Sequence, residues 1–347
     1  MEQRRSNIID IAKGLGIILM VIGHSSCPQW LHDFIYVFHM PLFFFLSGYC
    51  FNEKYVNDRF TFIRHRIKGL YVPFVKYNLL FLCLHNLFYR LHFIDAPISS
   101  ISEFSYKVGG TLLMGKLEEL VGPYWFLRYL FIAAIVFLFM FILLRRHQKI
   151  LMSVVFSMPF IATVLSYYHV RHFLTDVATL SIFFFACGYM AQRISLNRQP
   201  VFLAVLSIAI VAIASRFLHS EIVLMHYQDC IAYCVCALIG IYAVMAVSSY
   251  INDHSSRLQS IALYVGKHTM VILTWHVLLF KFINHFYITL WDLPSDQYYE
   301  TAIQHADHAW LWATYAIVGV VVPLLISHLF LQLKNNIKQR YHEHQQD

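Results

Sequence analysis

Long runs of apolar residues, separated by short polar segments, dominate the chain. About 20 consecutive apolar residues cross a bilayer core as a helix, and ten runs reach or approach that length. They lie near residues 8–23, 34–51, 70–91, 125–144, 150–168, 174–192, 200–217, 229–248, 261–283 and 311–333. The pattern therefore predicts an all-α, polytopic membrane protein with about ten transmembrane helices.

Composition supports this prediction and excludes an ordinary soluble protein. Hydrophobic residues make up 59% of the 347 residues and charged residues only 13%, against about a quarter charged in typical soluble domains. We expect one integral-membrane domain over residues 1–347, with the spans within 8–333 and a short cytoplasmic tail at 334–347. The seven cysteines are an odd number and lie mostly in apolar runs, so no disulfide framework is predicted.

Basic residues orient the predicted spans. When the N-terminus and alternate loops are placed inside, the inner loops hold sixteen of the 26 lysines and arginines, the outer loops hold three, and the rest fall within spans. This asymmetry follows the positive-inside rule and predicts that both termini are cytoplasmic. It also accounts for the net charge of +7, which therefore requires no nucleic-acid partner.

The first predicted helix carries three ionisable residues, Asp10, Lys13 and His24. Such groups are costly in a bilayer and face a protein interior or a water-filled cavity, which indicates a functional site. Lys13 and His24 are eleven residues apart, so they lie about 20° apart around a helix and ~16 Å apart along it. The alternative is an interfacial pair of Asp10 and Lys13, with His24 merely turned outward.

The second predicted helix contains His39, Pro41, Ser47 and Tyr49. Proline frees a backbone carbonyl and favours a kink, which would open a cavity. If this helix returns toward the cytoplasm, His39 lies at about the depth of His24, with Ser47 and Tyr49 nearer the cytoplasm. A histidine here is structural about as often as it is functional.

Two arginines, Arg64 and Arg66, follow the second helix in the next inner loop. Guanidinium groups present a planar donor fork to anionic oxygens, so a pair at a membrane mouth suits phosphate recognition. Anchoring by the positive-inside rule explains the same charges equally well.

Polar residues also enter two later spans. Trp125 and Arg128 stand at the start of the fourth predicted helix, and the ninth contains His268 and His276. Clustered polar groups within a bilayer indicate more than packing, although tryptophans in such places are usually core or interfacial residues.

Several motifs occur in the order found in the acyltransferase family 3 membrane proteins, which include bacterial polysaccharide O-acetylases and fucose 4-O-acetylase-like proteins. Each motif is weak alone, but together they span essentially the whole chain. The chain resembles that family at a basic residue followed after ten residues by histidine (Lys13 and His24), at Arg-x-Arg (Arg64 and Arg66), at the stretch from Phe38 to Tyr49, and at Tyr-Trp-Phe-Leu (Tyr124 to Leu127).

The resemblance implies a ten-helix transferase that takes acetyl groups from cytoplasmic acetyl-CoA and modifies a sugar hydroxyl. Many relatives carry a soluble hydrolase-like domain after the last helix, and none is expected after Lys334 here. A mechanism that needs a second domain is therefore not expected.

These observations give a hypothesis with named roles. His24 is the candidate base for the acceptor hydroxyl, since histidine is the commonest such base near neutral pH, and His39 is an orienting or acceptor-binding partner. The predicted donor-binding residues are Lys13, Arg64, Arg66 and Arg128; the predicted supporting residues are Asp10, Ser47, Tyr49, Trp125, His268 and His276. Whether transfer is direct or passes through an acyl-enzyme, for example on Ser47, stays open.

The expected partners are an acyl-CoA donor, a glycan or lipid-linked sugar acceptor, and the bilayer of a bacterial plasma membrane. No metal is predicted, because the spans contain no HExxH motif or compact group of histidines and carboxylates. The competing function is a transporter or flippase for a glycan or lipid-linked sugar, which would also need a polar path. Against it, no repeated halves with matching broken helices are visible.

Overall fold

The computed structural model describes residues 2–168, 176–193, 199–218, 222, 230–304 and 310–343. Within these ranges every regular element is a helix. The α-helices are α1 (Glu2–Gly23), α2 (Gln29–Tyr49), α3 (Arg59–Arg66), α4 (Val72–Cys83), α5 (His85–Arg90), α6 (Ile101–Leu112), α7 (Trp125–Leu144), α8 (Gln148–Tyr167), α9 (Asp176–Met190), α10 (Val201–Ala214), α11 (Cys230–His254), α12 (Ser256–Lys267), α13 (Thr269–Trp291) and α14 (Leu311–Glu343). Five shorter helical turns are η1 (Glu53–Val56), η2 (Ile67–Tyr71), η3 (Glu119–Tyr124), η4 (Ala191–Arg193) and η5 (Ser295–Tyr299).

The prediction of an all-α, polytopic membrane protein is confirmed. Each of the ten predicted spans overlaps an observed helix, and in the described residues seven helical segments are long and apolar enough to cross a membrane. They are Ser6–Gly23, Gln29–Tyr49, Glu119–Leu144, Gln148–Tyr167, Cys230–His254, Thr269–Trp291 and Leu311–Lys334. The other three predicted spans correspond to the shorter helices α4, α9 and α10.

Two predicted spans are interrupted. The run at 70–91 breaks at Leu84, between α4 and α5, where Asn86 exchanges two hydrogen bonds with the backbone of Ile98. The run at 261–283 breaks at His268, where α12 ends and α13 begins. In both places polar side chains form local or tertiary hydrogen bonds that the apolar pattern does not reveal.

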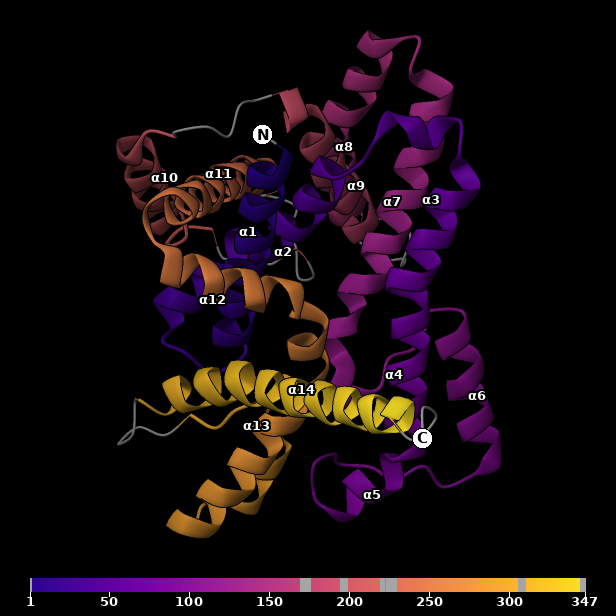
Figure 1. The fold of residues 1–347 in the computed structure, drawn as a ribbon, viewed down its shortest axis with the longest axis vertical. Coiled ribbons are helices and arrows are strands. Elements are labelled where there is room, and N and C mark those ends of the chain that lie inside the picture. The colour runs from indigo at the N-terminus through magenta and orange to yellow at the C-terminus, as the bar shows by residue number, and fades with distance from the viewer. Residues whose placement is uncertain are drawn as a thin grey trace.

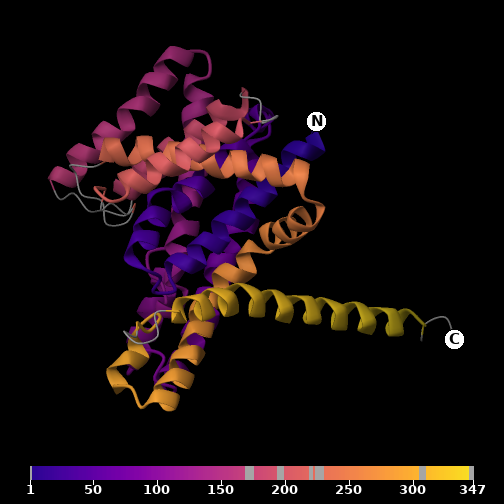
Figure 2. The same ribbon diagram turned by 90° about the vertical axis from the view of Figure 1, so that its left-hand side faces the viewer.

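The helices α1 and α2 occupy the centre of the molecule. Figure 1 shows α10, α11 and α12 on one side of them and α3, α4 and α7 on the other. Turned by 90°, the last helix, α14, extends away from this body toward the C-terminus (Figure 2). The central pair therefore contacts most of the surrounding bundle, and residues on it can be shared by several sites.

Glycines allow the central helices to approach their neighbours closely. A side chain at Gly266 of α12 would collide with the carbonyl oxygen of Asp10 on α1, and one at Gly48 of α2 would collide with the carbonyl oxygen of Phe185 on α9. Small residues permit such backbone contact between membrane helices. The expected kink at Pro41 does not divide α2, which continues through it as one helix.

Candidate active site

The side chain of His24 forms a hydrogen-bonded pair with His276 of α13. Their Nδ1 and Nε2 atoms are 3.1 Å apart, and Nδ1 of His276 lies 3.0 Å from the carbonyl oxygen of Ile272. A carbonyl only accepts, so His276 carries its proton on Nδ1 and accepts at Nε2 from His24 Nδ1–H. His24 is thereby fixed in the tautomer whose Nε2 holds a free lone pair, as a general base requires.

Backbone contacts hold His24 at the end of α1. Its N–H donates to the carbonyl of Met20 at 3.1 Å, and two residues later the Ser26 hydroxyl donates to the carbonyl of Ala302 at 2.7 Å. His24 therefore follows the last turn of α1, where the negative end of the helix dipole lies. That end stabilises the imidazolium formed when Nε2 takes up a proton.

His24 opens into an outer cavity of about 540 Å³. We define the outer cavity by its lining residues Gly23, His24, Ser26, Cys27, Gln29, His32, Tyr36, Glu119, Gly122, Pro123, Trp125, Val277, Thr301 and Gln304. Hydroxyl, amide, imidazole and aromatic groups share this lining, and among these described residues Glu119 is the sole carboxylate, with no lysine or arginine. The cavity can therefore receive a polar molecule beside the candidate base.

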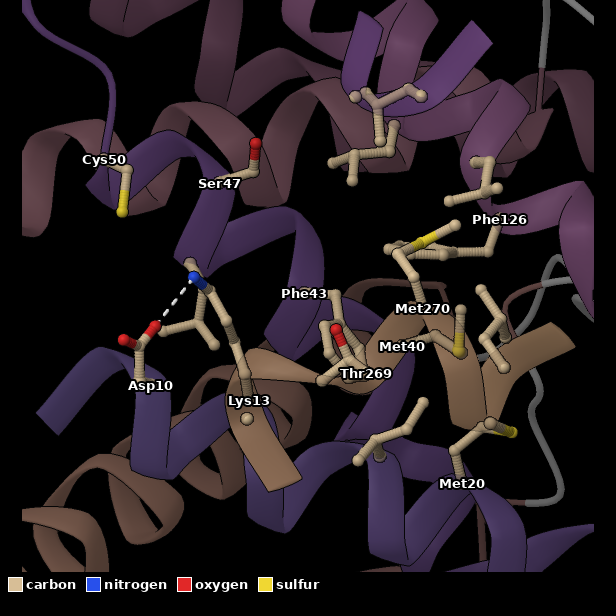
Figure 3. Close-up of a pocket in the computed structure, with 18 of the residues that line it drawn as sticks. Asp10, Lys13, Met20, Met40, Phe43, Ser47, Cys50, Phe126, Thr269 and Met270 are labelled. Atoms are coloured by element: carbon tan, nitrogen blue, oxygen red, sulfur yellow. Dashed lines mark hydrogen bonds and ion pairs between the residues drawn. The ribbon is translucent and has the colours of Figure 1, made fainter. Parts of the chain in front are cut away.

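An inner cavity of about 420 Å³ lies along the preceding turns of α1. Its lining is Asp10, Lys13, Ile17, Met20, Met40, Phe43, Leu46, Ser47, Cys50, Arg66, Gly69, Leu70, Phe126, Leu127, Leu130, Gly266, Lys267, Thr269, Met270 and Leu273. Figure 3 shows one end formed by Asp10, Lys13, Ser47 and Cys50, and the other by Met20, Met40, Met270 and Phe126. The cavity thus has a polar, basic end and an apolar end.

The interfacial pair considered from sequence is present, because Lys13 Nζ lies 3.1 Å from Asp10 Oδ1. Both residues nevertheless line the inner cavity, where Lys13, Arg66 and Lys267 outnumber the single carboxylate. An excess of positive charge at this end suits an anionic ligand.

Arg66 enters the inner cavity and Arg64 does not. Arg66 Nη1 donates to the Ser47 hydroxyl at 2.9 Å, and its guanidinium stacks over the Phe62 ring at 4.8 Å. Burial lowers the pKa of the Arg66 guanidinium from its usual value, since a low-dielectric environment disfavours the charged form. Arg64 is exposed on α3, and the π-helical turn η2 that follows places Gly69 and Leu70 in the cavity wall.

A partition about one helical turn thick separates the two cavities. On three helices the lining changes from inner to outer within four residues: Met20 and His24 on α1, Met40 and Tyr36 on α2, and Leu273 and Val277 on α13. Four residues of helix rise ~6 Å. The candidate base therefore stands on one side of a thin wall, with flexible methionines on the other.

Some of the predicted site residues lie outside both cavity walls. His39 is buried, and its Nδ1 donates to the carbonyl of Ile35 at 2.9 Å. We predicted it as an orienting or acceptor-binding partner, and the hydrogen bond that orients His24 comes from His276. Arg128 Nη1 donates to the carbonyl of Met114 at 2.9 Å, and His268 Nδ1 donates to that of Tyr264 at 2.7 Å. The functional assignments of these three residues stay predictions.

Two other predicted residues do line a cavity. Trp125 lies in the outer wall, although its neighbour Phe126 belongs to the inner one. Tyr49 lines a cavity of about 300 Å³ that shares Asp10, Lys13 and Cys50 with the inner cavity. The polar end of the inner cavity therefore continues toward the N-terminus of α1.

Lys281 is a functional residue for which no role was predicted from the sequence. Its ammonium is buried within α13 and donates to the carbonyls of Tyr298, Tyr299 and Glu300 at 3.3, 2.8 and 2.9 Å. Asn284, one turn further along, also donates to the Glu300 carbonyl at 2.8 Å. These bonds fix the segment that brings Thr301 and Gln304 to the outer cavity; a lysine inside an apolar span was the available signal.

Comparison with known proteins identifies the family. The family model described as an acyltransferase domain of the acyltransferase 3 type matches residues 6–331. A nodulation protein NolL of Sinorhizobium fredii is 31% identical over 135 residues, which cover 35% of this chain and 33% of that protein. A second NolL, from Mesorhizobium japonicum, is 29% identical over 138 residues, covering 36% and 33%.

The matched part spans about a third of the length of these two relatives. No solved structure matches the chain. The family match is far more extensive, since it runs from the first span to the last. The chain therefore belongs to the acyltransferase 3 family and is an integral membrane member of it.

Proposed function

We propose that this protein moves an acetyl group from acetyl-CoA to a hydroxyl group of a cell-envelope sugar or polysaccharide. The observation that carries the proposal is the position of His24. Its Nδ1–H is held by His276 at 3.1 Å, and it lines the outer cavity one helical turn beyond the inner cavity. A base is thereby placed between a basic chamber and a polar one.

The inner cavity is the donor site in this proposal. Lys13, Arg66 and Lys267 lie in its wall and offer cationic partners for the phosphates of CoA. The apolar end, with its three methionines (Figure 3), suits the thioester end of the pantetheine arm, because methionine adapts its shape to a flexible ligand. The ~16 Å from Lys13 to His24 along α1 is comparable to the reach of that arm.

The outer cavity is the acceptor site. A sugar hydroxyl there donates its proton to His24 Nε2 as its oxygen attacks the thioester carbonyl carbon. The carbon–sulfur bond then breaks, and the departing CoA thiolate takes the proton back from the imidazolium. His276 keeps the His24 ring oriented throughout and is a positioning residue. The reacting carbonyl must reach across the partition, so displacement of Met20 or Met40 is part of the cycle.

Orientation in the membrane follows from this assignment. Acetyl-CoA is a cytoplasmic metabolite, so the inner cavity faces the cytoplasm and the outer cavity faces the opposite side of a bacterial plasma membrane. This agrees with the charge pattern of the loops, which predicts cytoplasmic termini. Both cavities lie along α1, which can cross the membrane once.

Purified protein in lipid nanodiscs, incubated with radiolabelled acetyl-CoA and candidate glycans, tests the proposal. We expect label on the glycan and release of one free thiol for each acetyl group transferred. Mass spectrometry of surface glycans from cells with and without the gene then identifies the acceptor by the loss of one acetyl mass. In proteoliposomes, movement of an unmodified glycan across the membrane, with no label transferred, would instead support the transporter alternative.

A further inference from the structure

We propose that the outer cavity is a subsite for an uncharged, hydroxyl-rich sugar ring, with Glu119 as its hydrogen-bond acceptor and Trp125 as its stacking surface. The inference rests on the proposed function for the reaction, but it concerns which acceptors bind. It predicts that rings bearing a carboxylate or phosphate beside the reacting hydroxyl are rejected.

Two adjacent glutamates at the start of η3, Glu118 and Glu119, have opposite environments. Glu118 is buried, its Oε2 lies 2.8 Å from His85 Nδ1, and its Oε1 lies 3.8 Å from Lys107 Nζ. Glu119 is exposed and lines the outer cavity, and no hydrogen bond or ion pair joins its carboxylate to another residue in the described part of the chain. Glu118 therefore serves the fold, whereas the Glu119 oxygens are available to a ligand.

An ionised carboxylate accepts hydrogen bonds and donates none. It therefore binds hydroxyl groups and repels another carboxylate or a phosphate. Lys281 and His85 interact electrostatically with Glu119, and Asp95 and Glu118 oppose them. His85 already pairs with Glu118, and three backbone carbonyls already bind the Lys281 ammonium. An anionic ring would be repelled by Glu119, and the described lining has no lysine or arginine that would offset this repulsion.

The remaining lining groups fit a sugar ring. Trp125 presents an aromatic surface, against which the C–H face of a pyranose packs and buries apolar area. Thr301 and Gln304 add hydroxyl and amide groups, and their segment is fixed by Lys281. A few fixed polar groups around an aromatic surface are typical of a specific small-molecule site.

Binding measurements test the inference without acetyl-CoA. The probes are p-nitrophenyl glycosides of glucose, galactose and mannose, each paired with the corresponding uronic acid. Their binding to the protein in nanodiscs is measured by saturation-transfer NMR. In at least one series we expect the neutral glycoside to bind about tenfold more tightly than its uronic acid. Glu119→Gln should reduce that preference to less than about threefold, mainly by admitting the uronic acid.

The control is Asp296→Asn, which removes an exposed outer acid that does not line the cavity and should leave the preference unchanged. Trp125→Phe should retain binding that Trp125→Ala loses, with size-exclusion profiles confirming that both variants fold. The inference is overturned if the wild type binds the paired probes equally, or if Glu119→Gln keeps the same preference. It is also overturned if no probe binds in any series.

The outcomes separate this inference from the proposed transferase activity. If the neutral preference depends on Glu119 but acetyl is never transferred, the sugar subsite stands and the proposed reaction fails. If acetyl is transferred with a preference independent of Glu119, the reaction stands and the subsite assignment fails.

Discussion

The inner and outer cavities lie along the same helix, yet their walls have opposite character. The inner lining contains Lys13, Arg66 and Lys267 against one carboxylate, and its far end is apolar. The outer lining contains Glu119 and otherwise neutral polar and aromatic groups. Under the proposed function, this difference lets one short stretch of α1 serve an anionic donor on one side and a neutral acceptor on the other.

A thin wall makes this division chemically useful. Each cavity is shaped by residues of α1, α2, α7 and α13, so the two sites are held at a fixed separation by the same rigid elements. His24 lies at the outer surface of the wall and Met20 at its inner surface, one turn away. Variants on the two sides should therefore separate chemistry from donor binding.

The largest expected effect comes from His24→Ala. Removal of a positioned general base typically costs 10²–10⁴ in rate, so we expect kcat for acetyl transfer to fall about 1000-fold. Since His24 does not line the inner cavity, the Kd for acetyl-CoA, measured by isothermal titration calorimetry, should be unchanged. His254→Ala is the control, because that residue is exposed at the end of α11 and lies in neither wall; near-normal transfer by His24→Ala would disprove the assignment of the base.

His276 should have the next largest effect, through orientation of the base. His276→Phe keeps a ring but removes the acceptor for His24 Nδ1–H, so we expect about a 100-fold loss of kcat with little change in either KM. His276→Gln retains a side-chain acceptor and should recover about tenfold of that loss. Steady-state kinetics measure both; equal activity in the two variants would show that the hydrogen bond at 3.1 Å does not matter.

The two arginines of the Arg-x-Arg motif should differ. Arg66→Ala removes a cation from the inner wall, so we expect the KM for acetyl-CoA to rise about tenfold, in line with the loss of one charge-assisted phosphate contact. Arg64→Ala is the matched control, because that side chain is exposed outside the cavity, and its KM should change by less than about twofold. Equal increases in both variants would contradict the placement of the donor.

Much of this arrangement could be predicted from sequence, since apolar runs and helical spacing are local properties. The runs indicated the spans, and the eleven-residue interval placed Lys13 and His24 on one face of α1, where the structure has them lining successive cavities. The interruptions at Leu84 and His268 were not predictable in this way. They depend on where side chains find hydrogen-bond partners after folding.

The pairing of His24 with His276 illustrates the same limit. The two residues are 252 positions apart, and no periodicity relates them, so sequence reasoning included His276 only among supporting residues and favoured the nearer His39. Likewise Arg64 and Arg66 have the same chemistry in sequence, and only the geometry of α3 and η2 shows which enters the inner cavity. Long-range packing decides such choices.

The smallest expected effect concerns the wall itself. Met20→Ala shortens a buried side chain at the inner surface of the partition, so water from the outer cavity gains access to the thioester. We expect the rate of acetyl-CoA hydrolysis in the absence of acceptor, measured by the release of free thiol, to increase about threefold.

Met245→Ala is the control, because Met245 is also buried but lines neither cavity. Both substitutions should lower the free energy of unfolding by a few kcal/mol, about 2–5 for buried methionine, so only a change in hydrolysis distinguishes them. If the two variants hydrolyse acetyl-CoA equally, the thioester does not reach Met20, and the donor must bind elsewhere on the inner side.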